Sequence, residues 1–267
     1  MKKLFALFGV ALLASFVLAW WMDYNREWKK YQHSFFQMEL SLAKTEREKE
    51  AVREQSVEIK GYWLEDIDRV DRCITCHLGV SDPRLKTAKQ PFKTHPAIPE
   101  HPFDEFGCTL CHQGQGRATT VETAHGYVER WPEPMLKGVY LQSACARCHE
   151  PQTLTAAPVL MAGAKAFDQF GCRACHKTAG RGGDIGPDLT RAGRLSIEYL
   201  QESIVNPKAN DPKSIMPKLP LSQEQVQALV VYMFSQKDEK PLPGLMPPPK
   251  APAPAPTPAP VPTSASE

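Results

Sequence analysis

The chain has 267 residues and a formal net charge of +2, from 32 basic and 30 acidic side chains. So small a charge produces no strong positive field, which argues against a nucleic-acid partner. The length suggests about two domains. The spacing of the eight cysteines and eight histidines therefore carries most of the functional information.

The first 22 residues have the composition of a membrane-spanning helix. Lys2 and Lys3 precede an uncharged run, Leu4–Trp21, that is just long enough to cross a bilayer. The lysines favour a cytoplasmic N-terminus, and the tryptophans at the other end suit the outer interface. A signal peptide cleaved after residues 17–19 is the alternative. Helical sequence continues directly beyond the run, so we predict an uncleaved anchor over residues 1–22.

Residues 23–60 predict a helical stalk, because they contain neither Gly nor Pro and are rich in good helix formers. Large apolar residues recur there every three or four positions and define one helix face. This aromatic stripe consists of Trp28, Tyr31, Phe35, Met38 and Leu42. A single helix cannot bury such a face by itself, so either the following segment folds back over it or a partner covers it. His33 lies beside the stripe and is predicted to be a surface or packing residue, with metal ligation as the alternative.

A Cys-x-x-Cys-His motif then occurs four times and uses all eight cysteines. The motif is the attachment signature of c-type haem. Its two thiols reach the two vinyl groups of one haem, and its histidine binds the iron. A single such pair could also be a zinc half-site or a redox dithiol. Four repeats, each with its histidine, predict four covalently attached haem c groups and an exported chain without disulfides. The motif residues are Cys73, Cys76 and His77; Cys108, Cys111 and His112; Cys145, Cys148 and His149; and Cys172, Cys175 and His176.

Four histidines lie outside the motifs, and three of them lie within the segment 61–154 that holds the first three motifs. We predict that His95, His101 and His125 are the second axial ligands of these three haems. Their spacing does not show which histidine serves which haem, and Met135 and Met161 are alternative ligands for the third. Many prolines and glycines separate the motifs, so we expect little regular structure beyond short helical turns at the motifs.

Residues 20–150 resemble multihaem cytochromes that accompany cytochrome b-type quinol-oxidising complexes in anaerobic respiratory bacteria. The resemblance rests on the order of the motifs from Cys73 to His112 and on the sequences around His95, His101 and His125. It implies an electron-carrying subunit that receives electrons, with menaquinol as their source, from an integral-membrane quinol-oxidising partner. We expect this partner to cover the aromatic stripe.

A Thr-, Ala- and Pro-rich stretch after Glu150 predicts a linker, and the following residues resemble a complete class I cytochrome c, an all-α domain. Gly163 and Phe167 precede the fourth motif as in the family's first helix. The loop 186–189 matches the family loop whose proline carbonyl accepts the N–H of the motif histidine, here His176. Residues 214–219 resemble the methionine loop, which implies that Met216 is the second axial ligand.

The last helix of this domain begins with a capping box formed by Ser222 and Gln225. The resemblance implies that its apolar face and Tyr232 pack across the first helix of the domain. The Pro/Ala-rich residues that follow predict a disordered, polyproline-like tail.

The sequence thus predicts a mainly α chain in five parts. They are a transmembrane anchor (1–22), a long stalk helix (23–60), a trihaem domain with little regular structure (61–154), an all-α class I cytochrome c domain (155–237) and a tail (238–267). We expect the anchor to lie in the inner membrane and the haem domains in the periplasm.

We predict an electron-transfer subunit that is not itself an enzyme and that relays electrons from the quinol-oxidising complex to a periplasmic acceptor. The alternative is a multihaem reductase of a small nitrogen or sulfur oxyanion, which needs one iron without a strong second ligand. Five good candidate ligands exist for four irons, so no site has to be open; they are His33, His95, His101, His125 and Met216. A haem sensor would need an output domain, and the sequence does not predict one.

Overall fold

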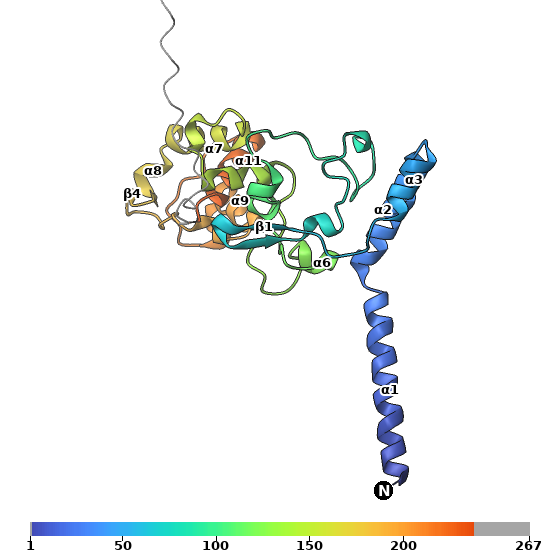
Figure 1. Ribbon diagram of the computed structural model, residues 1–267. Coiled ribbons are helices and arrows are strands. Elements are labelled where there is room, and N and C mark those ends of the chain that lie inside the picture. Colours follow the sequence, from blue (N-terminus) through green and yellow to red (C-terminus); the bar gives the residue numbers. More distant parts are fainter. Residues whose placement is uncertain (1, 238–267) are drawn as a thin grey trace, which may run out of the picture.

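The computed structural model describes residues 2–237, apart from the side chain of Asp66, and is mainly helical, as predicted. The tail expected at 238–267 lies outside the described residues. Helix α1 (Lys2–Tyr24) projects away from the rest of the chain (Figure 1), and none of its side chains is buried. Its length and apolar composition would allow it to cross a membrane, although a signal sequence would share both properties.

The stalk predicted as one long helix is broken in two places. Helix α1 ends where the side-chain amide of Asn25 donates to the carbonyl of Trp21 at 2.8 Å, and α2 (Glu27–Leu42) begins two residues later. A second break precedes α3 (Glu46–Arg53), which starts with a capping box between Thr45 and Glu48. Helix α3 packs beside α2, and the two form a hairpin (Figure 1).

The aromatic stripe is largely buried within the chain. Trp28 and Phe35 are 6% and 7% exposed, and Phe35 packs with Phe36, Val52 of α3 and Leu85. The expectation that a membrane partner covers the stripe is therefore wrong for these residues. The segment after the first motif folds back against α2 instead. The buried face also contains two polar residues, Gln32 and Glu39, and the last stripe residue, Leu42, is 41% exposed.

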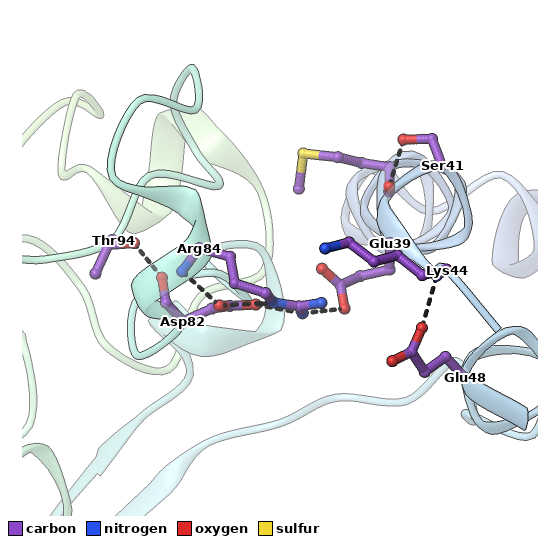
Figure 2. A network of polar contacts seen from close by, with 8 residues as sticks. Glu39, Ser41, Lys44, Glu48, Asp82, Arg84 and Thr94 are labelled. Atoms are coloured by element: carbon purple, nitrogen blue, oxygen red, sulfur yellow. Dashed lines mark hydrogen bonds and ion pairs between the residues drawn. The ribbon is translucent and has the colours of Figure 1, made fainter.

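An ion-pair cluster holds α2 against this segment. The guanidinium of Arg84 lies between two carboxylates, 2.7 Å from Glu39 of α2 and 2.6 Å from Asp82 (Figure 2). The hydroxyl of Thr94 donates to the backbone carbonyl of Asp82 and anchors the loop from the other side. These contacts join the stalk and the first motif in one folded unit.

The segment between the stalk and residue 154 contains only short elements, as predicted. A hairpin of β1 (Tyr62–Leu64) and β2 (Arg69–Asp71) opens it. The remaining elements are η1 (Glu65–Ile67), η2 (Cys73–Thr75), η3 (Pro83–Leu85), α4 (Phe103–Phe106), α5 (Thr109–His112), α6 (Val121–Ala124), η4 (Gly138–Arg147) and η5 (Pro151–Thr153).

The regular structure of the C-terminal part is helical, apart from one hairpin of two-residue strands. Its elements are α7 (Pro158–Gln169), α8 (Cys172–Cys175), β3 (Lys177–Thr178), β4 (Arg181–Gly182), η6 (Ala192–Arg194), α9 (Ile197–Val205), α10 (Pro207–Asn210) and α11 (Gln223–Phe234). Helices α7 and α11 cross at Gly163, where a Cβ atom would lie 1.9 Å from the carbonyl oxygen of Ala228. Beside this crossing, the rings of Phe167 and Tyr232 lie 5.3 Å apart. The predicted capping box of α11 is confirmed.

The core of this part continues into the third motif. Leu136 is buried in it, and Tyr140 and Cys145 of η4 pack against it. The stretch predicted as a linker contains η5 and then Ala157, which is only 1% exposed. Residues 136–157 are thus packed onto the C-terminal helices.

Candidate haem-binding site

All four motifs form the same tight turn, as predicted. In each, the N–H of the histidine donates to the carbonyl of the first cysteine at 2.9–3.0 Å. The pairs are His77 and Cys73, His112 and Cys108, His149 and Cys145, and His176 and Cys172. The turn brings both thiols of a motif close to its histidine, and all eight cysteines are free and half-buried.

The structure brings each of the three predicted second ligands beside one motif histidine. The ring centres of His77 and His125 are 6.3 Å apart. Those of His112 and His95 are 5.9 Å apart, as are those of His149 and His101. The three pairs define one candidate site for each of the first three motifs.

These separations fit an iron held between two imidazoles. With metal–nitrogen bonds of about 2.0 Å, as at zinc sites, and a nitrogen about 1.2 Å from its ring centre, two coaxial ligands have centres about 6 Å apart. Burial lowers the pKa of His77, His112 and His125, which favours the neutral, metal-binding imidazole. The Nδ1 atom of His101 is buried without a hydrogen-bond partner among residues 2–237. The residues present therefore fit haem with two axial histidines.

Short local contacts orient these second ligands. His125 follows α6, whose first N–H, on Val121, donates to the Glu27 carboxylate of α2 at 2.9 Å. The Nδ1 atom of His95 lies 2.7 Å from the carbonyl of Pro96, so a proton on Nδ1 leaves Nε2 free for a metal. The ring of Phe106 lies 4.8 Å from that of His101.

The fourth motif has its own orienting contact, as the class I resemblance implied. The Nδ1 atom of His176 lies 2.9 Å from the carbonyl oxygen of Pro187, which directs Nε2 toward a metal and strengthens it as a donor. A Cβ on Gly186 would lie 2.5 Å from the same ring. Met216 lies half-buried in the loop that precedes α11.

The remaining candidate ligands lie on other segments of the chain. His33 is exposed on α2, and no ring contact involves it among the described residues 2–237. Met135 donates its backbone N–H to the carbonyl of His125, and Met161 is part of α7. With His101 beside His149, the third motif has an imidazole candidate that makes these sulfurs unnecessary.

The first three motifs contact one another in the order of the sequence, and the third and fourth share a hydrophobic core. The sulfurs of Cys73 and Cys108, from the first and second motifs, lie within 4.8 Å of each other. Arg147 of the third motif donates to the carbonyl of Leu110 in the second at 3.2 Å. Burial raises the pKa of Cys111 to about 11, and the nearby Cys145 thiol adds to the rise. Cysteines of the third and fourth motifs pack against one core.

Two polar residues that hold the first motif were missed in the sequence. Gln32 is fully buried, and its amide donates to the carbonyl of Thr75 inside the first motif at 3.0 Å. Asp71 is also fully buried. Burial opposes its ionisation, but hydrogen bonds from Cys73, Thr109 and Cys108 outweigh this effect and lower the pKa of the carboxyl. The sequence pointed to Gln32 only through its position on the buried face of α2. No sequence pattern pointed to Asp71.

Comparison with known families agrees with the C-terminal part of this architecture. Residues 158–233 match the family described as cytochrome C oxidase, cbb3-type, subunit III. This stretch is a cytochrome c domain, and such a domain implies covalently bound haem c. No curated protein matched the chain, and no solved structure did. The domain and the apolar helix α1 fit a membrane-anchored electron-transfer cytochrome.

The Met216→His variant is expected to affect one haem and spare the others. A thioether ligand raises a haem potential relative to a second imidazole, so one midpoint potential should fall and the weak near-infrared sulfur-to-iron band should disappear. Potentiometric titration and near-infrared spectroscopy of the purified protein measure both effects. Met135→Leu and Met161→Leu are matched controls that should leave the band intact. Persistence of the band in Met216→His would assign the sulfur ligand to another methionine.

Proposed function

We propose that the chain is a membrane-anchored tetrahaem c-type cytochrome that relays electrons from a quinol-oxidising membrane partner to a periplasmic acceptor. The three histidine pairs carry this proposal, because each would give an iron two strong axial ligands and leave no open position. Haem groups at the four motifs would supply reversible one-electron transfer. The chain supplies ligands, burial and spacing.

The ligand set argues against the reductase alternative. A reductase needs an iron position that a substrate can occupy, with polar groups beside it. In the segment 61–154, every motif histidine already faces a second histidine, and the fourth motif belongs to a cytochrome c domain. This arrangement supports electron transfer over substrate reduction.

The position of the first motif supports electron entry near the membrane. Only Asn25 and Arg26 separate α1 from α2, and Gln32 of α2 is bonded to the first motif. Gln32 lies eight residues beyond Tyr24, or about 12 Å at the helical rise of 1.5 Å per residue. The first motif therefore packs against the part of the chain that lies nearest to the proposed membrane helix.

The contact between the third motif and the C-terminal domain supports a fixed relay. The carboxylate of Glu133 lies 2.7 Å from Arg147 in the third motif and 3.1 Å from Lys237 after α11. All three side chains are at least three-quarters buried. Together with the shared core, this cluster supports a domain that is held in place and does not swing on a tether. Two imidazoles favour a low potential and a methionine a higher one, so the order of sites supports flow toward the fourth motif.

The membrane partner is proposed from the apolar helix and from the resemblance of residues 20–150. Its docking surface cannot be the centre of the aromatic stripe, because Trp28 and Phe35 are buried within the chain. The motifs support an inner-membrane location with periplasmic haem domains, since haem of this kind is attached on the outer side of that membrane.

The full chain, matured in a periplasm that attaches haem, tests the proposed function. Intact mass should exceed that of the apoprotein by four haems, and the spectrum of the oxidised protein should contain only low-spin iron. Reduction by a quinol should require the isolated membrane partner. Three or fewer haems, or a high-spin iron that binds nitrite or sulfite, would contradict the proposal.

A further inference from the structure

The first two motifs share one buried carboxylate. Asp71 ends β2, and its side chain is completely buried. One carboxylate oxygen accepts the N–H of Cys73 at 3.2 Å, and the other accepts the N–H groups of Cys108 and Thr109 at 2.8 and 2.7 Å. Asp71 thus bonds to the first cysteine of each of two motifs that lie 35 positions apart in the chain.

The surrounding backbone is shaped to bring the two motifs to this side chain. Gly107, just before the second motif, has a φ of +63°, a region that favours glycine, and a Cβ there would lie 3.1 Å from the Asp71 carboxylate. The β1–β2 pairing sets Asp71 opposite Tyr62, and Asp71 stands two residues before the first cysteine of the first motif. Two separate parts of the chain therefore meet at the two carboxylate oxygens of Asp71.

The charge at this site is not balanced by a side-chain cation. No ion pair involves Asp71 among the described residues 2–237. Its hydrogen-bond donors are backbone N–H groups and the thiol of Cys73, which would become a thioether once haem is attached. A carboxylate oxygen lies within 4.8 Å of both the Cys73 and the Cys108 sulfur, the atoms through which the two haems would be attached. A buried negative charge favours the more positive, oxidised state of a nearby iron, and it acts strongly where water is excluded.

We propose that Asp71 is a positioning residue that fixes the first two haem sites against each other and holds the reduction potentials of both low with a single shared charge. This inference rests on the proposed function. Asp71 touches neither iron, so its effect acts through the two attachment turns and through its charge.

The Asp71→Asn variant of the full, haem-loaded protein tests the inference. Asparagine removes the charge and offers one acceptor oxygen where the carboxylate offers two. The couples of the first and second haems should both rise by at least the equivalent of a tenfold change in equilibrium constant, which is 59 mV for one electron. The couples of the third and fourth haems should not move. Alanine variants of His125 and His95 assign the two affected couples.

Asp104→Asn is the matched control, because Asp104 is an exposed carboxylate in the same segment, on α4. Solvent screens its charge, so all four couples should stay in place. Four intact haems with unchanged potentials in Asp71→Asn would overturn the inference and leave the proposed function standing. An equal shift of all four couples would overturn it as well, since that pattern indicates a general loosening of the fold.

Selective loss of the first or second haem from Asp71→Asn, with the third and fourth retained, would support the positioning role. If Asp71→Asn yields no haem-loaded protein, the Asp71→Glu variant tests the inference instead, because it retains the negative charge. Four haems with near-normal potentials in Asp71→Glu would show that the carboxylate is required. If neither variant yields haem protein, Asp71 serves folding alone and the inference is wrong.

Discussion

Replacing His125, His95 or His101 by alanine is expected to convert one low-spin haem to the high-spin state in each variant and to leave the other three unchanged. Each of these imidazoles faces a different motif histidine at 5.9–6.3 Å, so each removal opens a different iron. Axial ligands set haem potentials over a range of about 0.8 V, so the potential of the opened site should change by on the order of 100 mV or more. Electron paramagnetic resonance and potentiometric titration of the purified variants measure both effects.

His33→Ala is the matched control, because His33 is exposed on α2 and has no motif partner in the described residues 2–237. It should leave all four haems low-spin. A high-spin signal from this variant, together with an unchanged spectrum from one of the other three, would show that the ligand set is wrong.

The pairing itself can be tested separately. In a chain that lacks the first haem through Cys73→Ala and Cys76→Ala, removal of His125 should add no high-spin iron, because its partner iron is already missing. Removal of His95 should still add it, because His95 faces the second motif. The reverse result would exchange the two assignments.

The Phe35→Asp variant is expected to destabilise the protein and alter its haem spectrum, whereas a stalk that only docked a partner would tolerate the change. Phe35 is 7% exposed and packs edge-on against Phe92, at 5.5 Å, and against Phe36. Loss of a buried Phe side chain costs about 3–5 kcal/mol, and an unpaired buried charge adds to that cost. Thermal unfolding followed by circular dichroism should show a lower Tm. Electron paramagnetic resonance should show a changed signal from the first haem.

Gln37→Asp introduces the same charge on the exposed side of the same helix and should change neither property. If Phe35→Asp instead leaves Tm and spectrum intact but separates the protein from its membrane complex, then the stripe contacts a partner and the packing described for α2 is wrong.

The parts of the site that depend on local sequence were predictable. Each motif closes its own turn, and the class I resemblance led to the contact between His176 and Pro187, which the structure contains. Both depend on residues close together in the chain, where spacing determines geometry. The capping box at Ser222 belongs to the same group.

The pairing of histidines could not be predicted, because it depends on how loops without regular structure cross one another. His125 lies beyond the second motif yet faces the first, and His101 lies before the second motif yet faces the third. No periodicity connects such positions. Asp71 escaped notice for the same reason, since its partners Cys108 and Thr109 are remote in sequence.

The stalk was misjudged for a reason visible in the sequence. Thr45 and Glu48 have the spacing of a capping box, which predicts a helix start inside the segment expected to be one helix. The buried face of α2 also contains Gln32 and Glu39, which are unusual on an apolar face. Gln32 bonds to the first motif, and Glu39 pairs with Arg84, so these polar residues indicated a fold within the chain.

The crossed histidine pairs also affect the order in which the protein can mature. A bond from His125 to the iron at the first motif, or from His101 to the iron at the third, would close a loop of about 50 residues. Closing such a loop has an entropic cost that short local contacts do not offset. In the proposed export the first motif would leave the membrane well before His125, so its thiols would stay accessible to the attachment apparatus until the later segment arrives. Each haem would then act as a cross-link between remote parts of the chain. Folding of residues 61–150 would thus depend on haem loading, as in small domains that fold only with their metal.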